Sequence, residues 1–330
     1  MKNLLIFEYI TSNPSKFFLK NQVLLEEGIK MIDKLSFDFQ KSIGIKKISV
    51  IRNTKLNFKK YKNINYFLTN KRISWLDILK NLDIKKTKVL LIAPETNNII
   101  SSVLKIINSL GFEVLCSDTN TIIKFRSKFS TYNNLKKKKI PCVKSFKKIS
   151  EVEKKKLKYI VKPNISSGSE NVFLAKNYKE LSRILKKTNF SYVIQYYKPK
   201  MVGSFSMICL KGKSIVLACN KQIVSKKKRI SQIGSFIGKY EKYRQNFIKI
   251  ANLISKSFPG LYGYVGVDVV FEDNMWKVIE INPRFTTSYV GLEKVYGGKI
   301  NRMIIDLYTK NKIKLNKLVD IKKSRKLIFK

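Results

Sequence analysis

Hydrophobic and polar positions follow two different periods along the first third of the chain, and the change of period separates strands from helices. Residues 4–10 and 88–93 are short and mostly apolar, as expected of strands that are buried on both faces of a sheet. Residues 23–39 and 99–110 instead place their apolar side chains at near-helical spacing. Further elements continue this alternation, namely strands at 48–52 and 112–116 and a helix at 75–82. The order predicts a first lobe of about 120 residues built on a parallel sheet.

The pattern beyond residue 128 is less regular but contains the same kinds of elements. It predicts a helix at 131–138 and strands at 159–162, 172–175 and 192–196. We expect strands and helices to alternate from there to the end, with a basic, peripheral tail after about residue 310. The chain is therefore predicted to be an α/β protein with three units, at 1–120, 121–195 and 196–330.

The segment 263–282 predicts a β-hairpin, because two β-rich runs flank a short polar turn. Pairing that is symmetric about Asn274 places Asp268 directly opposite Glu280, since both lie at the same distance from the centre. Side chains opposed in this way have Cβ atoms about 4.5 to 5.5 Å apart. Asn282 points to the same face as Glu280, because side chains alternate along a strand.

Two carboxylates and an amide oxygen on one face predict a cation site. Opposed like charges destabilise a sheet, and buried unpaired carboxylates are costly, so the arrangement needs a positive ion. We expect Val270 and Val278 to flank the group on the same face. Oxygen ligands favour Mg²⁺ or Mn²⁺, held by Asp268, Glu280 and Asn282. The alternative is a solvent-facing hairpin with ordinary surface charges, and a one-residue slip in register would also separate the ligands.

Cationic and hydroxyl side chains follow the hairpin directly. The forked, permanent charge of Arg284 suits a phosphoryl group in transfer, so Arg284 is the predicted catalytic residue. Thr286, Thr287 and Ser288 supply hydroxyl groups beside the metal and are the predicted substrate contacts. The alternative for Arg284 is an ordinary surface arginine.

A second cationic element lies upstream, where the strand at 159–162 ends in Lys162 and is followed by the polar turn 164–169. A small-residue loop can cover phosphates with its backbone N–H groups, while a lysine on the strand provides a fixed charge. Ser167 and Gly168 of this turn are therefore predicted ATP contacts together with Lys162. The sequence contains no G-x-x-x-x-G-K-[ST] element, so a P-loop site is not supported.

The composition excludes several kinds of chemistry. The 330 residues include no histidine and only four scattered cysteines, which argues against zinc sites, disulfide frameworks and histidine bases. The formal net charge of +46 would suit a nucleic-acid-binding protein, which is one rival interpretation. The lysines are spread over the whole length, so we favour a compositional bias without a specific nucleic-acid partner. No apolar run approaches the roughly 18 residues of a membrane span, and we expect a cytoplasmic protein.

Three motifs in this order resemble an ATP-grasp enzyme: Val161-Lys162-Pro163, the acid at 268, and the stretch 280–284. The resemblance implies an ATP-grasp fold with an N-terminal parallel-sheet (pre-ATP-grasp) domain, ATP as co-substrate and a bound divalent cation. It implies that 121–195 is the nucleotide-binding lobe and that 196–330 carries the metal site. It also implies that Lys128 and Lys162 contact ATP, and that Gln195 to Tyr197 form the hinge whose backbone holds adenine, with Gln195 and Tyr197 as contacts.

A closer resemblance covers nearly the whole chain. The sequence is similar to the tyramine-glutamate ligases of methanofuran biosynthesis and to their relatives in C1-metabolising bacteria. The similarity is carried by Phe7-Glu8-Tyr9, Glu27-Gly28, 92–96, 220–222, 263–268 and 281–292. The chain departs from that family at Ser127, where an aspartate is usual, at Tyr196, where a hinge acid is frequent, and in its glycine-poor phosphate loop. These departures concern the nucleotide contacts and leave the magnesium hairpin untouched.

These observations predict an ADP-forming carboxylate-amine ligase that works through an acyl-phosphate. The resemblance implies glutamate as the carboxylate and tyramine or tyrosine as the amine, in the synthesis of a methanofuran-type or methylofuran-type cofactor. Tyr264 or Tyr289 would supply an aromatic wall for the phenolic ring, and the alternative is that both pack in the core. We expect a homodimer that acts on small molecules, with no membrane partner. A degenerate ATP-grasp protein that binds nucleotide without ligase activity is the second rival.

Overall fold

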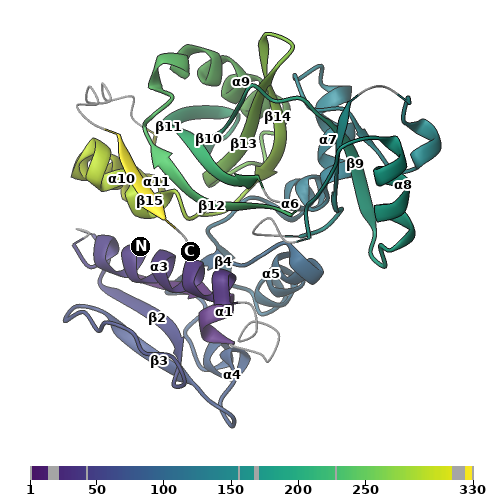
Figure 1. Ribbon diagram of the computed structural model, residues 1–330. Coiled ribbons are helices and arrows are strands. Elements are labelled where there is room, and N and C mark those ends of the chain that lie inside the picture. The colour runs from purple at the N-terminus through teal and green to yellow at the C-terminus, as the bar shows by residue number, and fades with distance from the viewer. Residues whose placement is uncertain are drawn as a thin grey trace.

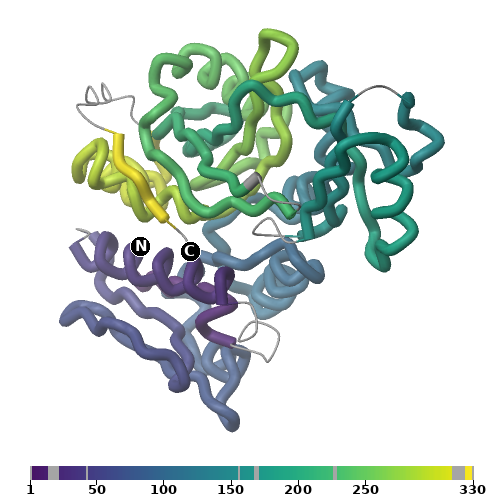
Figure 2. The backbone as a smooth tube through the Cα atoms, viewed as in Figure 1, coloured from purple at the N-terminus to yellow at the C-terminus, as the bar shows by residue number. Residues whose placement is uncertain are grey.

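The computed structural model describes residues 2–13, 22–41, 44–154, 157–166, 171–226, 229–313 and 324–328 (Figures 1 and 2). The first of its three sheets has the strand order β3-β2-β1-β4-β5, with every neighbouring pair parallel. Its strands are β1 (Asn3–Glu8), β2 (Lys47–Asn53), β3 (Asn65–Thr69), β4 (Thr87–Ile92) and β5 (Glu113–Val114). Its helices are α1 (Tyr9–Ser12), α3 (Gln22–Phe39), α4 (Trp75–Lys80), the 3-10 helix η1 (Thr96–Asn98) and α5 (Ile99–Ser109). The predicted parallel sheet is confirmed.

The central strand β1 shows why this sheet is parallel and covered on both faces. Leu4 and Ile6 belong to one apolar cluster with side chains of α3, whereas Leu5 and Phe7 belong to another with side chains of α4 and α5. A strand buried on both faces is continuously apolar, as in the sequence. Strand β3 was not predicted, because its edge position leaves it only half-buried and its run is less apolar.

The second sheet is small and antiparallel, with the order β6-β9-β7-β8. Its strands are β6 (Ser145–Phe146), β7 (Lys158–Pro163), β8 (Phe173–Ala175) and β9 (Tyr192–Tyr197). The nearby helices are α6 (Thr119–Phe125), α7 (Lys128–Lys137), the 3-10 helix η2 (Ile149–Glu151) and α8 (Tyr178–Lys186). The three predicted strands of this region are confirmed, and its helix begins three residues earlier than predicted, because the Ser127 side chain caps it.

The third sheet is larger and has the order β14-β13-β10-β11-β12-β15, with antiparallel pairing throughout. Its strands are β10 (Met201–Leu210), β11 (Lys213–Lys226), β12 (Ile230–Ile237), β13 (Gly263–Glu272), β14 (Met275–Asn282) and β15 (Arg325–Ile328). Its helices are the 3-10 helix η3 (Glu241–Tyr243), α9 (Arg244–Ser257), α10 (Tyr289–Tyr296) and α11 (Gly298–Lys310).

One prediction for this region was wrong. Strands and helices do not alternate to the end, because β10, β11 and β12 follow one another as antiparallel neighbours. The described part of the basic tail is mostly exposed at the edge of the sheet, in agreement with a peripheral tail, but it forms a strand, β15, that pairs with β12. Charged residues in β15 hid the strand from the sequence, since an edge strand needs little apolar surface.

The three sheets form one body. Figure 1 shows the parallel sheet at the bottom, the large antiparallel sheet above it and the small sheet to the right. Helix α3 lies on the side of the parallel sheet that faces the other two (Figure 1). A single apolar cluster continues from Leu4 and Leu35 through Tyr289 and Leu292 to Leu307, so the N-terminal sheet packs against the C-terminal helices. Among the described helices, none has the length and apolar character that crossing a membrane requires.

Candidate active site

A cavity lies between the small and the large antiparallel sheet. Its floor is one face of the β13–β14 hairpin, and β7, β9, β10 and β11 form its sides. Helix α3 of the N-terminal half reaches the same cavity through Glu27. The charged residues of the predicted site and the amide of Asn282 line this cavity, the charged ones being Lys128, Lys162, Asp268, Glu280 and Arg284.

The hairpin brings Asp268 and Glu280 directly opposite each other, as predicted, but by a different route. The ladder is not symmetric about Asn274, because Val270 pairs with Lys277 instead of Val278. A one-residue bulge at Ile279 then restores the opposition of Asp268 and Glu280. The prediction that Val270 and Val278 flank the carboxylates on one face was wrong for Val278. Val270 lines the cavity, whereas Val278 belongs to the apolar core.

The surroundings of Asp268 show the electrostatic cost of this pairing. Burial first, and then the charge of Glu280, raise the pKa of Asp268 to about 7. The side-chain amide of Gln222, on β11, donates to Asp268 Oδ1 at 2.7 Å, and the amide of Asn282 donates to Asp268 Oδ2 at 3.4 Å. A carboxylate held this way is strongly favoured in its charged form by a nearby cation.

The donor set fits a hard divalent cation. Among the described residues, no group of three or more histidine, cysteine, aspartate or glutamate side chains is arranged to hold a metal. Asp268, Glu280 and Asn282 offer two carboxylates and one amide oxygen. These ligands are too few to fill the coordination shell of an ion without water or a substrate. Mg²⁺ commonly binds through one or two carboxylates and completes its shell with water and substrate phosphates.

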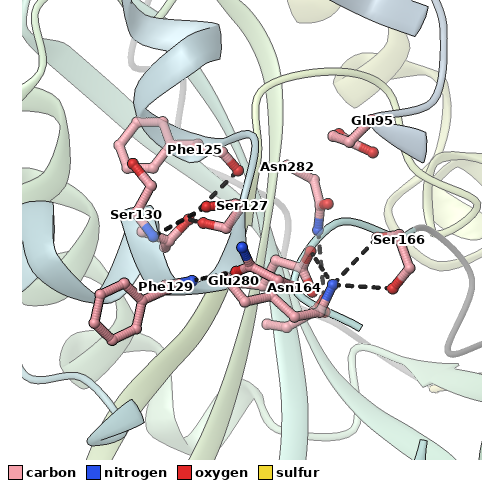
Figure 3. A network of polar contacts seen from close by, with 12 residues as sticks. Glu95, Phe125, Ser127, Phe129, Ser130, Asn164, Ser166, Glu280 and Asn282 are labelled. Atoms are coloured by element: carbon pink, nitrogen blue, oxygen red, sulfur yellow. Dashed lines mark hydrogen bonds and ion pairs between the residues drawn. The ribbon is translucent and has the colours of Figure 1, made fainter. Parts of the chain in front are cut away.

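Lys128 faces the carboxylate pair from the start of α7. Its Nζ lies 3.3 Å from Glu280 Oε1 and donates to the backbone oxygen and the hydroxyl of Ser166, both at 3.2 Å. The backbone of Asn164 accepts from the Lys128 N–H at 2.9 Å, which ties α7 to the end of β7. Figure 3 shows Ser166, Glu280 and Asn282 converging on this point.

Lys162 enters the same group from the end of β7. It is buried, and burial together with the neighbouring charge of Lys128 lowers the pKa of Lys162 to about 8, whereas Glu280 and Asp268 oppose that shift. Two buried lysines so close to each other require negative charge nearby. Glu280 and Asp268 supply such charge, and the contact of the two lysines with phosphate stays a prediction.

The predicted hinge lies at the other end of the cavity. Gln195 and Tyr197 of β9 both line it, with Tyr196 between them. The Gln195 side chain donates to the hydroxyl of Ser145 at 2.8 Å and is buried, so it is fixed by β6 and is not directed freely into the cavity. Ser167 and Gly168, the predicted loop contacts, lie outside the described residues.

Arg284 makes a contact that the sequence did not reveal. Its Nε and Nη2 donate to the two carboxylate oxygens of Glu95 at 2.8 and 2.7 Å, and Nη1 donates to the backbone oxygen of Phe285 at 3.1 Å. Burial lowers the pKa of Arg284, but the Glu95 ion pair outweighs it and raises the pKa above its usual value. Glu95 follows β4, at the carboxyl end of the parallel sheet. Arg284 therefore joins the two halves of the molecule beside the cavity, and its contact with phosphate stays a prediction.

The hydroxyl-bearing segment after the hairpin lines the cavity, but the nearby tyrosines do not. Thr286, Thr287 and Ser288 are all at the wall. Tyr264 and Tyr289 are buried against the ring of Phe285, and their hydroxyls bond Ser206 and Asp38. The predicted aromatic wall is therefore wrong for both tyrosines, because they belong to the core.

Three residues were not assigned a role from the sequence, namely the cavity residues Glu27 and Gln222 and the Arg284 partner Glu95. Each lies in a short motif that carried the family resemblance, at 27–28, 92–96 and 220–222. Their positions in the sequence give no sign of these contacts, because the partners are far apart along the chain. Gln222 contacts Asp268, and Glu95 contacts Arg284.

Comparison with known proteins agrees with this geometry. A family model described as an ATP-grasp domain matches residues 125–288. A tyramine–L-glutamate ligase from Methanocaldococcus fervens is 27% identical over 314 residues, covering 93% of this chain and 93% of that protein. One from Methanocaldococcus jannaschii is 29% identical over 314 residues, covering 93% of this chain and 88% of that protein.

A solved structure shows the same fold. The chain superposes on an ATP-grasp superfamily protein from Archaeoglobus fulgidus with a TM-score of 0.71 and 19% identity, covering 99% of this chain and 91% of that one. The predicted fold class is confirmed by this likeness and by the parallel N-terminal sheet.

Proposed function

Because the chain belongs to the ATP-grasp superfamily of ligases, we propose that it activates a carboxylate with ATP and joins it to an amine. The observation that carries this proposal is the meeting of Asp268 and Glu280 with two buried lysines in one cavity. A pair of opposed carboxylates with lysines beside it suits a cation and the phosphates that the cation accompanies. A surface hairpin with ordinary charges would not need this burial.

The reaction divides into two steps with a defined balance of atoms. A carboxylate oxygen of the donor attacks the γ-phosphorus of ATP, the bond from that phosphorus to ADP breaks, and ADP leaves. The nitrogen of the amine then attacks the acyl carbon, the carbon–oxygen bond to phosphate breaks, and inorganic phosphate leaves. The amine loses a proton, so the products are an amide, ADP and phosphate.

The residues of the cavity would mainly position and neutralise. Lys128 and Lys162 would bind the phosphate oxygens, and Gln195 and Tyr197 would border the adenine, with Ser167 and Gly168 covering the phosphates. A divalent cation, Mg²⁺ or Mn²⁺, held by Asp268, Glu280 and Asn282 would neutralise phosphate charge. Phosphoryl transfer needs little more than such positioning and charge stabilisation, so the absence of histidine from the sequence is no obstacle.

Glutamate is the donor that we propose, and a phenolic amine such as tyramine or tyrosine is the acceptor. The support is the name of the two relatives, each of which aligns over 93% of this chain. An anionic amino acid also suits a cavity lined by lysines and by the hydroxyls of Thr286, Thr287 and Ser288. The aromatic residues that would face the phenolic ring are not Tyr264 or Tyr289, which are buried.

An ADP-release assay tests the proposal. Purified enzyme with ATP and Mg²⁺ should release ADP and phosphate with glutamate plus tyramine or tyrosine, and much less with either substrate alone. Activity confined to aliphatic or peptide amines would refute the phenolic acceptor and keep the ligase. Nucleotide binding without ADP release for any carboxylate and amine would instead support the degenerate, non-catalytic alternative.

A further inference from the structure

Asn164 is a residue to which the proposed reaction gives no role. It follows Lys162 and Pro163 at the end of β7 and is half-buried. Its backbone N–H donates to the backbone oxygen of Ser191 at 2.8 Å, directly before β9, which anchors it to the small sheet. Its two oxygens contact helix α7, which begins with Lys128. Asn164 therefore lies between the strand that carries one cavity lysine and the helix that carries the other.

The start of α7 depends on these two oxygens. The first N–H groups of a helix have no partner within it. The Ser127 side chain accepts from the Ser130 N–H at 3.1 Å, which covers one of them. The backbone oxygen of Asn164 accepts from the Lys128 N–H at 2.9 Å, and Asn164 Oδ1 accepts from the Phe129 N–H at 3.1 Å (Figure 3). Asn164 thus caps α7 from the end of β7 and fixes the backbone of Lys128.

The same segment also holds the far end of the Lys128 side chain. Lys128 Nζ donates to the backbone oxygen and the hydroxyl of Ser166, both at 3.2 Å, two residues after Asn164. A lysine ammonium sits on a flexible four-carbon stem, so its position is defined only when the backbone is fixed as well. Lys162 lies two residues before Asn164, and both lysines are buried. This segment therefore sets where the two ammonium groups lie relative to each other.

The separation of these two charges matters because both lysines line the cavity. Like charges repel, so the lysines would move apart if their backbones allowed it. Phosphoryl transfer depends mainly on the positioning of charges, and a displacement of about 1 Å can cost a hundredfold in rate. A residue that keeps both lysines in place would contribute to nucleotide binding without touching the nucleotide.

We propose that Asn164 is a positioning residue that keeps Lys128 at the separation from Lys162 that the phosphates of a nucleotide require. The inference rests on the proposed ATP-dependent function and deepens it, because it concerns how the lysines are held. In this role Asn164 acts through Lys128, and its own contact with α7 is made without a ligand.

Nucleotide binding by Asn164→Ala and by a matched control tests the assignment. Asn177 makes the same kind of contact, because its Oδ1 accepts from the Glu180 N–H at 2.9 Å at the start of α8. Asn177 is exposed, and neither it nor any residue of α8, a helix that the structure describes in full, lines the cavity. Asn177→Ala therefore removes a helix cap away from the lysines.

The measurement is isothermal titration of the purified protein with ADP in the presence of Mg²⁺. In Asn164→Ala we expect the Kd for ADP to rise roughly fivefold or more, part of the loss that removal of a charged hydrogen bond causes. Asn164→Ser keeps a hydroxyl acceptor and should bind ADP more tightly than Asn164→Ala. Asn177→Ala should bind ADP as the wild type does.

A second series asks whether Asn164 acts through Lys128. Lys128→Met removes the ammonium and should itself raise the Kd for ADP roughly tenfold or more. If Asn164 works by placing that ammonium, Asn164→Ala should raise the Kd little further in the Lys128→Met background. A rise in the double variant equal to the product of the two single effects would mean that Asn164 acts independently of Lys128.

Three outcomes would overturn the proposal. One is a wild-type Kd for ADP in Asn164→Ala, the second is an equal rise in Asn164→Ala and Asn177→Ala, and the third is the independent effect in the double variant. If the wild-type protein itself binds no ADP, the proposed ATP-dependent function fails instead, so the two failures are distinguishable.

Discussion

Asp268 and Glu280 occupy a position that the protein alone does not favour. Burial first, and then the charge of Glu280, raise the pKa of Asp268 to about 7, while Lys128 Nζ lies 3.3 Å from Glu280 Oε1. Groups whose pKa values are shifted in this way are common at functional sites. A bound cation would relieve the repulsion between the two buried carboxylates. The charge of Glu280 is therefore the part of the site whose removal is most informative.

We predict that Glu280→Gln lowers kcat by roughly a hundredfold or more, the scale seen when one charge-stabilising group is removed. The shape of the side chain is kept, and Asp268 loses its repelling neighbour, so the melting temperature should stay close to that of the wild type. Steady-state ADP release and thermal unfolding measure the two quantities. Asp273→Asn, at the exposed turn of the same hairpin, should keep full activity. Full activity in Glu280→Gln would remove the basis for the cation site.

At the scale of elements, the hairpin shows how far the sequence could predict the site. The apolar alternation and the polar turn were enough to predict two strands and the opposition of Asp268 and Glu280. The turn is nevertheless offset from Asn274, and this offset alone would have turned Glu280 to the core face. The bulge at Ile279 compensates for it, and no residue type in the sequence marks that bulge. The prediction was confirmed because two deviations cancel.

Other elements were predictable to the extent that their stability is local. Helix α3 and the buried strands of the parallel sheet carry their own periodic patterns, so their existence followed from the sequence. The edge strand β15 and the long strands β10 to β12 depend on partners far along the chain. The Arg284–Glu95 ion pair spans 189 positions and three-dimensional packing alone brings it together.

Helix α3 supplies the prediction at this scale. We expect Gly28→Ala to leave the free energy of unfolding nearly unchanged, because two effects oppose each other. The new Cβ atom would lie 3.1 Å from Glu8 Oε2, and such crowding costs stability, whereas alanine in place of glycine favours the helix by about 1 kcal/mol. A urea titration measures the net effect. A loss of more than about 2 kcal/mol would show that α3 cannot move away from Glu8 to make room.

At the scale of the whole molecule, the two halves are joined beside the cavity by a buried ion pair. Arg284 and Glu95 have side chains only 13% and 5% exposed, and removing one partner of such a pair leaves a buried charge uncompensated. We predict that Glu95→Gln lowers the free energy of unfolding by about 3 kcal/mol or more, measured by urea titration. The double variant Glu95→Gln/Arg284→Met should recover part of that loss.

The exposed pair between Lys88 and Glu113 in the same parallel sheet provides the control. Glu113→Gln should change stability by less than about 1 kcal/mol, as is usual for exposed ion pairs. Equal effects of the Glu95 and Glu113 variants would show that the Arg284 contact does not hold the halves together.

The net charge of +46 leads to a prediction about partners. Because the lysines are dispersed along the sequence, DNA and RNA should bind weakly at physiological salt, without sequence preference and with affinity that falls steeply as salt rises. Fluorescence anisotropy with unrelated oligonucleotides at several salt concentrations measures this. A nanomolar, sequence-selective complex at physiological salt would point to a nucleic-acid function.

Transfer of oxygen from the carboxylate to phosphate tests the central claim most directly. In the proposed reaction the carboxylate oxygen that attacks ATP leaves with inorganic phosphate when the amine displaces it. Glutamate labelled with ¹⁸O in its carboxylates, incubated with the enzyme, ATP, Mg²⁺ and tyramine, should therefore yield phosphate that carries one ¹⁸O for each amide formed, as read by mass spectrometry. Unlabelled phosphate alongside amide product, or label recovered in AMP, would contradict activation through an acyl-phosphate.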